Sequence, residues 1–317
     1  MKLHNILFLI LANILLLGNL GCSSHQHTIN DYKQECDNNV AGSCNKLGDI
    51  YLKGLGVERN LNLAIKYHEK ACNQGSNDSC NAIGEWYFHS LGAHAYGVER
   101  DPVQAKKYFE KACIQGMHGN ACTNLAIVYW NGYGAEKNID TADMYLWKAC
   151  DLYRDGDGCY NRAYMYSKGL NGPVDEKSAK KYKIAAEKYY KEACDRNNGT
   201  QCGKLTLFYY RENKYQQATF YAKKACDLND RYGCYMAGSL NENDYSAIYY
   251  YDKACAIGHS FSCEKLGGMY EDGSEITRIN KTLAKSYYKK CCDLVGGDRN
   301  LDGYSCEGYE KLSEQGY

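Results

Sequence analysis

The feature that most constrains this chain is a cysteine that returns with alanine eight residues before it and tyrosine five residues before it. Alanine, tyrosine and the residue next to the cysteine then stand at i, i+3 and i+7, which is one face of a helix. Recurrence of such a helix at a regular period is the signature of a repeat protein. The triplets are Ala64/Tyr67/Cys72, Ala105/Tyr108/Cys113, Ala142/Tyr145/Cys150, Ala186/Tyr189/Cys194, Ala218/Tyr221/Cys226, Ala247/Tyr250/Cys255 and Ala284/Tyr287/Cys292.

A second cysteine follows each triplet, and a second apolar stripe of helical period begins there. The run between the two cysteines is polar and carries turn residues, as in NQGSNDS after Cys72, so it should end the first helix. Each repeat therefore predicts two helices, here called helix A and helix B, with a tight turn between one unit's helix B and the next unit's helix A. Helix A carries a small residue four positions after its cysteine, as at Gly48 and Gly267. Glycine costs about 1 kcal/mol relative to alanine inside a helix, so close packing of the two helices should offset it.

Sixteen of the eighteen cysteines form eight neighbouring pairs, which persist as disulfides in oxidising compartments. A zinc site would need C-x-x-C clusters or histidines at ligand spacing, and neither occurs, so no metal or cofactor is expected. Cys291 is left over at an alanine position of helix B, as a small buried thiol or as an intermolecular partner. The predicted pairs are Cys36–Cys44, Cys72–Cys80, Cys113–Cys122, Cys150–Cys159, Cys194–Cys202, Cys226–Cys234, Cys255–Cys263 and Cys292–Cys306.

The repeats resemble a known family. The segments KACNQGSNDSCNAIGEWY, GVERNLNLA, GVERDPVQA and KACAIGHSFSCEKLGGMY are similar to Sel-like repeats (SLR), and the C-x7-C staple resembles that of the Helicobacter cysteine-rich protein family. The resemblance covers residues 31–317. It implies an all-α fold, an α/α superhelical solenoid of tetratricopeptide-like repeats stapled by disulfides. It also implies β-lactamase or penicillin-binding activity, with a β-lactam or peptidoglycan-like small molecule as ligand.

The N-terminus predicts export. Lys2 precedes an apolar run at residues 6–17, which has the length of a signal-peptide core. Gly21-Cys22 resembles a lipoprotein processing site, so lipidation of Cys22 and simple cleavage both stay open. The expected location is secreted or periplasmic, with an outer-membrane lipoprotein as the alternative. The predicted divisions are an export signal (1–22), a flexible segment (23–30) and one solenoid (31–317), made of an N-terminal half-helix cap (31–43), seven helix-pair repeats (about 44–291) and a capping helix (304–317).

Catalytic motifs are almost absent. The S-x-x-K element of serine β-lactamases occurs at Ser43, Ser178, Ser262 and Ser286, but no S-D-N or K-T-G element accompanies it. An enzymatic role therefore rests on the resemblance alone. A net charge of zero gives no indication of a nucleic-acid partner, and a membrane is expected only through a lipid on Cys22.

The remaining hypothesis is that the concave side of the solenoid binds a protein or an extended peptide. In the tetratricopeptide register this groove is lined by helix A positions two before, one after, five after and eight after the cysteine. We expect none of these side chains to be needed for packing helix A on helix B. Two alternatives stay open: the aromatic residues could contact one another, and the chain could serve as a structural or host-interaction surface protein. The predicted groove residues are Asn45, Asp49, Asn81, Glu85, Ile127, Trp130, Tyr160, Tyr164, Leu207, Tyr210, Tyr232, Tyr235 and Phe261.

Overall fold

The computed structural model describes residues 28–89, 98–241, 245–274, 276–294 and 299–317, and within them it contains sixteen α-helices and no named strand. The predicted export signal, Cys22 and residues 23–27 lie outside the described residues. None of the described helices is both long and apolar enough to cross a membrane. Residues 28–30 were expected to belong to a flexible segment, but they are ordered at the start of the first helix, where Thr28 and Asp31 form a capping box.

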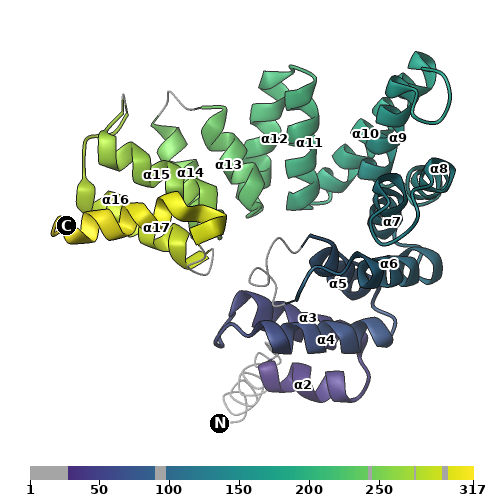
Figure 1. Ribbon diagram of the computed structural model, residues 1–317, viewed down its shortest axis with the longest axis horizontal. Coiled ribbons are helices and arrows are strands. Elements are labelled where there is room, and N and C mark those ends of the chain that lie inside the picture. Colours follow the sequence, from purple (N-terminus) through teal and green to yellow (C-terminus); the bar gives the residue numbers. More distant parts are fainter. Residues whose placement is uncertain (1–27, 90–97, 242–244, 275, 295–298) are drawn as a thin grey trace, which may run out of the picture.

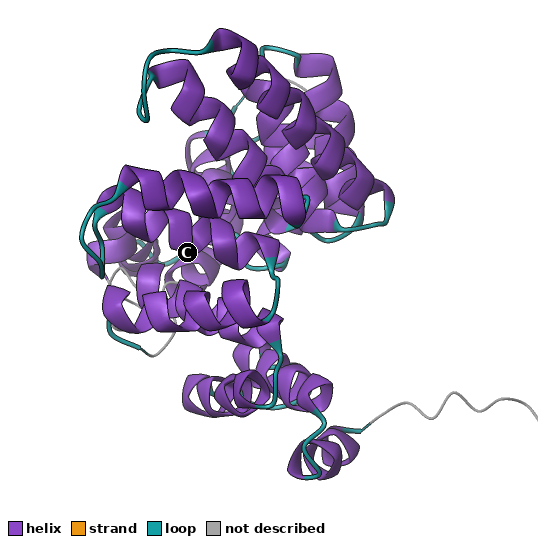
Figure 2. Ribbon diagram, turned by 90° about the vertical axis from the view of Figure 1, so that its right-hand side faces the viewer, coloured by secondary structure: helices purple, strands orange, loops and turns teal. Residues whose placement is uncertain are grey.

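The helices follow one another as antiparallel pairs around an arc (Figure 1), and the view from the side shows the same stacking of pairs (Figure 2). Single helices stand at the two ends, α2 (Ile29–Asp37) and α17 (Arg299–Glu314), the latter starting five residues before the predicted cap. Helix A of the successive units is α3 (Ala41–Lys53), α5 (Asn77–His89), α7 (Gly119–Asn131), α9 (Gly156–Lys168), α11 (Gly199–Arg211), α13 (Arg231–Ser239) and α15 (Ser260–Asp272). Helix B is α4 (Leu61–Asn73), α6 (Pro102–Glu110), α8 (Ile139–Trp147), α10 (Glu176–Asp195), α12 (Tyr215–Asp227), α14 (Ser246–Ala256) and α16 (Lys281–Leu294).

Helix B starts where the sequence supplies a capping side chain. The Asn60 side chain accepts a hydrogen bond from the Leu63 N–H, as expected for an N-cap residue. Asp101 caps α6 in the same way, and Pro102 occupies the first helical position, where its missing N–H costs nothing. Asn138, Asp175 and Asn280 cap α8, α10 and α16 in the same manner, whereas α12 and α14 start without a side-chain cap.

Helix A packs closely on helix B, as expected, because a small residue of helix A lies against an aromatic ring of helix B. A Cβ placed on Gly84 would lie 2.5 Å from the ring of Phe109, and one on Gly267 would lie 2.5 Å from the ring of Tyr288. Both rings are fully buried. Next to this contact, a tyrosine of helix A stacks on a tyrosine of helix B in six units, with ring centroids 5.4–5.9 Å apart. Most of the tyrosines at repeated positions are therefore interhelical packing residues.

All eight predicted disulfides are present, and each joins helix B of one unit, or the cap α2, to the following helix A. Two of the short staples span nine residues instead of eight. In those two units helix B ends in a π-helical turn, η1 (Lys111–Gln115) or η2 (Lys148–Leu152). A π-turn accommodates one extra residue within a helix, so it restores the register of the staple. Cys291 is buried and lies outside the eight disulfides, and its Sγ donates to the Ser260 carbonyl.

Unit four departs from the expected register. Its helix B, α10, has 20 residues against 13 in α4 or α12, a difference of seven that equals about two helical turns. The extra turns place Tyr182, not Tyr189, against Tyr166 of helix A. Because two turns return the helix to the same face, Cys194 still reaches Cys202. The sequence left open whether the loop or helix B was lengthened, and the structure shows that it is helix B.

Candidate binding groove

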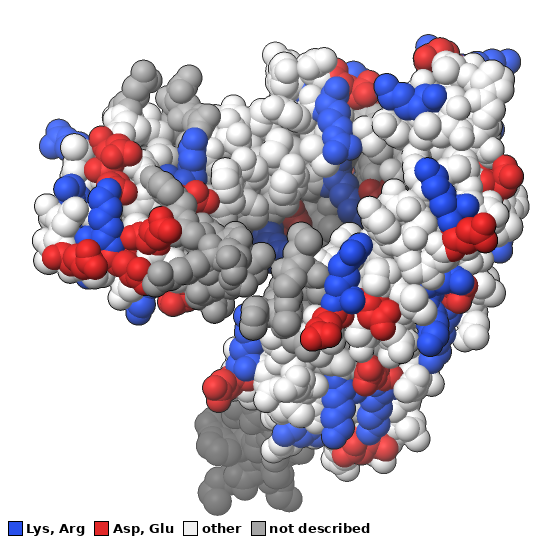
Figure 3. All heavy atoms as spheres, viewed as in Figure 1, with Lys and Arg blue, Asp and Glu red and all other residues white. Residues whose placement is uncertain are grey.

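The inner side of the arc is hollowed, and helix A of several units lines it. A cavity of about 620 Å³ is bordered by residues of α5, α7, α9, α10 and α11. We call the helix A surface around this hollow the concave groove. Lysine and arginine are interspersed with acidic residues over the face that contains the hollow (Figure 3).

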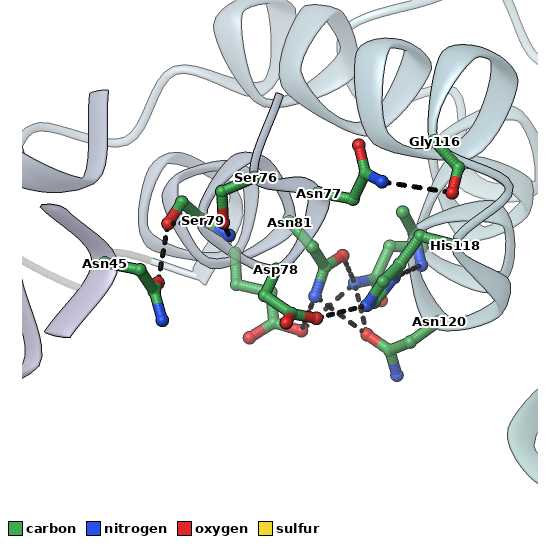
Figure 4. Close-up of polar contacts among 12 residues, drawn as sticks. Asn45, Ser76, Asn77, Asp78, Ser79, Asn81, Gly116, His118 and Asn120 are labelled. Carbon is green, nitrogen blue, oxygen red and sulfur yellow. Dashed lines mark hydrogen bonds and ion pairs between the residues drawn. The ribbon is translucent and has the colours of Figure 1, made fainter. Parts of the chain in front are cut away.

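The N-terminal part of the groove carries a hydrogen-bonded network of asparagines (Figure 4). Asn81 donates to Glu85 and to Asn120, each at 3.0 Å. Asn124 donates to Asn81 at 3.0 Å and also contacts Glu85 and Asn120 at 3.2 Å. The side chains come from α5 and α7, so they hold two neighbouring helices in register. We call these four residues the asparagine network.

The network changes the role expected for Asn81. Asn81 is only 8% exposed, and both ends of its amide are engaged within the network. Asn45 is likewise occupied, since its Oδ1 accepts from Ser79 at 2.6 Å. The groups that face the hollow are Asn120 and Glu85, which also line the 620 Å³ cavity. Asn81 is therefore a residue that orients the others.

Asp49 lies beside a buried histidine. Its Oδ1 is 3.8 Å from Nε2 of His68, and the His68 Nδ1 is 3.3 Å from the Ser79 hydroxyl. His68 packs under Gly48 and edge-on to Trp86. Burial lowers the pKa of His68, although Asp49 opposes that effect.

The centre of the groove holds a half-buried ion pair between Lys204 and Asp157. Tyr190 donates to the same carboxylate at 2.6 Å, and Thr123 donates to the neighbouring Asp155 at 2.7 Å. Burial raises the pKa of Asp155; for Lys204 burial acts to lower the pKa, but Asp157 raises it above its ordinary value. Lys204 lines the 620 Å³ cavity, so its positive charge in the wall is compensated by Asp157 behind it.

The aromatic positions divide into two groups. Tyr164, Tyr210, Tyr232 and Phe261 are exposed, at 46%, 44%, 36% and 51% of their surfaces. We call these four residues the aromatic strip. The expectation that groove residues are not needed for packing concerned only the packing of helix A on helix B; the side chains of the second group pack against the hydrophobic clusters and do not lie free in the groove. That group, half-buried against the hydrophobic clusters, is Ile127, Trp130, Tyr160 and Tyr235.

Neighbouring aromatic residues also contact one another. Trp130 and Tyr164 have ring centroids 6.0 Å apart, and Tyr235 lies 5.6 Å from Phe261. These contacts follow the groove from one unit to the next and leave the outer faces of the aromatic strip uncovered. The alternative in which aromatic residues meet one another is therefore partly correct. Leu207, by contrast, is half-buried and borders a small cavity of about 150 Å³ next to Lys204.

The S-x-x-K serines have other partners. Ser43 is buried and donates to Glu35, and Ser262 is fully buried with its hydroxyl 2.9 Å from Nδ1 of His259. Ser286 donates to the Leu283 carbonyl within its own helix. None of these three serines lines the 620 Å³ cavity. Within the described ranges, no group of three or more His, Cys, Asp or Glu side chains could hold a metal ion.

A helical solenoid with paired helices, staples between units and a lined concave face defines a class of α/α repeat protein. The Sel1 repeat profile matches seven segments, at residues 41–76, 77–117, 119–153, 156–198, 209–230, 231–259 and 260–294. These segments make up most of the chain, which therefore belongs to the Sel1 repeat family. Among curated proteins, cytochrome c oxidase assembly factor 7 of Xenopus tropicalis is 37% identical over 65 residues, which is 17% of this chain. The chain spans 28% of the length of that relative.

Solved structures of similar fold include a protective antigen of uropathogenic Escherichia coli strains that displays an SLR fold. It is 18% identical, with 90% of this chain and 70% of that chain covered and a TM-score of 0.44. A Sel1 repeat protein from Oxalobacter formigenes is also 18% identical, with 93% and 88% covered and a TM-score of 0.43. An immunity protein from Pseudomonas aeruginosa is 21% identical, with 73% and 88% covered and a TM-score of 0.49.

Proposed function

We propose that this chain is an exported scaffold whose concave groove binds an extended segment of a partner protein. The observation that carries the proposal is the asparagine network at the edge of the 620 Å³ cavity. Asn120 and Glu85 of the network line the cavity, so an amide and a carboxylate are placed to meet the N–H and C=O groups of an extended backbone. Because the network holds these groups in place before a partner arrives, binding costs less ordering entropy.

The aromatic strip supports the same proposal. Each of its rings exposes more than a third of its surface in the described structure. Tyrosine and phenylalanine provide a large apolar contact at low conformational-entropy cost, and such residues dominate the energetics of many interfaces. A segment lying along the groove would place its backbone near the asparagine network and its apolar side chains on the aromatic strip.

The cysteines support export. Eight disulfides in a chain of this size are typical of an oxidising compartment. The signal-like N-terminus agrees with that environment, and we propose secretion or delivery to the periplasm. A lipid on Cys22 would add membrane anchoring, which mass spectrometry of the mature N-terminus would detect.

The proposal is tested by capturing a partner from periplasm or medium, mapping the bound segment and measuring its affinity as a synthetic peptide. Tyr210→Ala and Trp130→Ala should each weaken binding by about 1–3 kcal/mol, as truncated anchors do. Tyr249→Ala removes a 59% exposed tyrosine from helix B of unit six and is the matched control. If both groove variants bind the peptide as tightly as the parent does, the concave groove is not the site.

A further inference from the structure

The two extra turns of α10 leave part of unit four uncovered by unit five. α7 packs against α9, and α11 packs against α13, whereas α9 and α11, like α3 and α5, make little direct contact; unit four meets unit five mainly through α10 and α11. The pair α9–α10 and the pair α11–α12 diverge from each other at this point (Figure 1). A cavity of about 390 Å³ lies between α9, α10 and the C-terminal end of α11. We call this cavity the wedge pocket.

The floor of the wedge pocket is apolar. Tyr160 and Phe208 meet edge to face there, with ring centroids 6.1 Å apart. Small side chains leave the space between the helices open, at Ala163 of α9 and at Ala179 of α10. Ile184 borders the cavity from α10 and is 58% exposed. An isoleucine this exposed beside two aromatic rings is apolar surface that a bound group would cover.

The charges at the rim are compensated within the protein. Lys183 of α10 forms a 2.9 Å ion pair with Glu212, the C-cap residue of α11, and Glu187 accepts a 2.8 Å hydrogen bond from the Tyr209 hydroxyl. The whole lining contains three lysines and three glutamates, so its formal charge is zero. A charged ligand group would lose its hydration on entering the pocket, and no net opposite charge in the lining would offset that cost. The lining therefore fits an uncharged occupant.

The wedge pocket opens from the concave groove. Tyr160 and Tyr164 line it, and both hold groove positions of helix A, one and five residues after Cys159. A segment following the groove therefore passes the mouth of the pocket. The volume is at the lower end of the range for ligand-binding cavities, and it suits one large side chain better than a whole small-molecule ligand.

We propose that the wedge pocket receives a bulky, uncharged side chain, aromatic or branched aliphatic, from the segment bound in the concave groove. This inference rests on the proposed function and names the residue that would set its specificity. Tyr160 and Phe208 provide the aromatic contact, while Ile184 closes one side. Because the pocket arises from the lengthened α10, the preference belongs to unit four and not to the repeat in general.

The test is selection of random twelve-residue peptides, displayed on phage, against the oxidised full chain, followed by affinity measurements on the enriched peptides. We expect enriched peptides to share a tryptophan, phenylalanine, leucine or isoleucine at one aligned position. Ile184→Glu, which puts a charge at the pocket wall, should weaken the best peptide at least tenfold. Ile114→Glu changes an isoleucine of similar exposure, 55%, that does not line the pocket, and should change affinity less than twofold.

The outcomes separate this inference from the proposed function. If Asn124→Ala weakens the peptide while Ile184→Glu and Tyr164→Ala leave its affinity unchanged, the groove binds and the wedge pocket inference is wrong. The shared peptide residue is also replaced by alanine. If this replacement weakens binding to the parent protein but not to the Ile184→Glu protein, the result supports the inference. Failure to enrich any peptide contradicts both. Enrichment of acidic or basic peptides without a shared apolar residue contradicts only the inference.

Discussion

Replacing Gly84 by alanine should destabilise unit two, although alanine is the better helix former. The new Cβ would lie 2.5 Å from a ring carbon of Phe109. That ring is fully buried and packs against Phe88, so it has little room to retreat. Overpacking a filled core costs about 1–3 kcal/mol, whereas the gain in helix propensity is about 0.5–1 kcal/mol. The net expectation is a loss of about 1–2 kcal/mol.

The measurement is urea denaturation followed by circular dichroism, with hydrogen exchange of α5 and α6 to localise the effect. Gly42→Ala is the control, because a Cβ at this helical position meets nothing within 4 Å. It should leave stability unchanged or raise it by up to about 1 kcal/mol. A double variant, Gly84→Ala with Phe109→Leu, should recover part of the lost stability, because leucine is smaller than the phenylalanine ring that the new Cβ meets. Equal or greater stability of Gly84→Ala relative to the parent would refute the packing argument.

Two further predictions concern acid and reduction. Burial, with a smaller effect of Arg231, lowers the pKa of His259 from 6.5 to about 4, so the native state favours the neutral ring. The free energy of unfolding should therefore fall as the pH drops from about 6.5 towards 4, by roughly 1–2 kcal/mol after allowing for the partial exposure of the ring. In urea denaturation repeated over this pH range, His259→Gln should reduce that fall. Reduction of the disulfides should open residues 202–255 first, because α13 and α14, with 9 and 11 residues, together form the shortest helix pair of the described structure. Hydrogen exchange that finds this segment the best protected after reduction would contradict the reasoning.

The fold was largely predictable because its determinants are local. A staple, a capping side chain and a small residue facing a ring each depend on a few positions within one unit, so their spacing is visible in the sequence. Tyr182 was not predictable in the same way, because the triplet ending at Cys194 matches the repeat whether the extra residues extend a loop or a helix. The π-turns η1 and η2 had a visible signal, namely an eighth residue between the two cysteines where other short staples have seven, but spacing alone does not show where a helix absorbs it.

The groove was predicted less completely than the fold. Asn120 stands two residues before Cys122, a position already assigned to the groove, so the sequence contained its signal. Asn124 and Lys204 stand two residues after their cysteines, a position outside the expected set. They reach the groove because their partners lie on the neighbouring unit, at Asn81 and Asp157. Contacts between units depend on superhelical curvature, which no single repeat encodes.

The short span of the staples also bears on how the thiols find their partners. Cys80 lies 8 residues from Cys72 but about 33 from Cys113. The closure entropy of a flexible loop grows with its length, so the nearer encounter is favoured by about 1.3 kcal/mol, or roughly eightfold. Reoxidation can therefore proceed largely by chain statistics, before any tertiary structure exists. Loop length does not favour either Cys291 or Cys292 as the partner of Cys306, because the two cysteines are adjacent in the sequence. Only the folded structure, in which Cys291 is buried, distinguishes the two thiols.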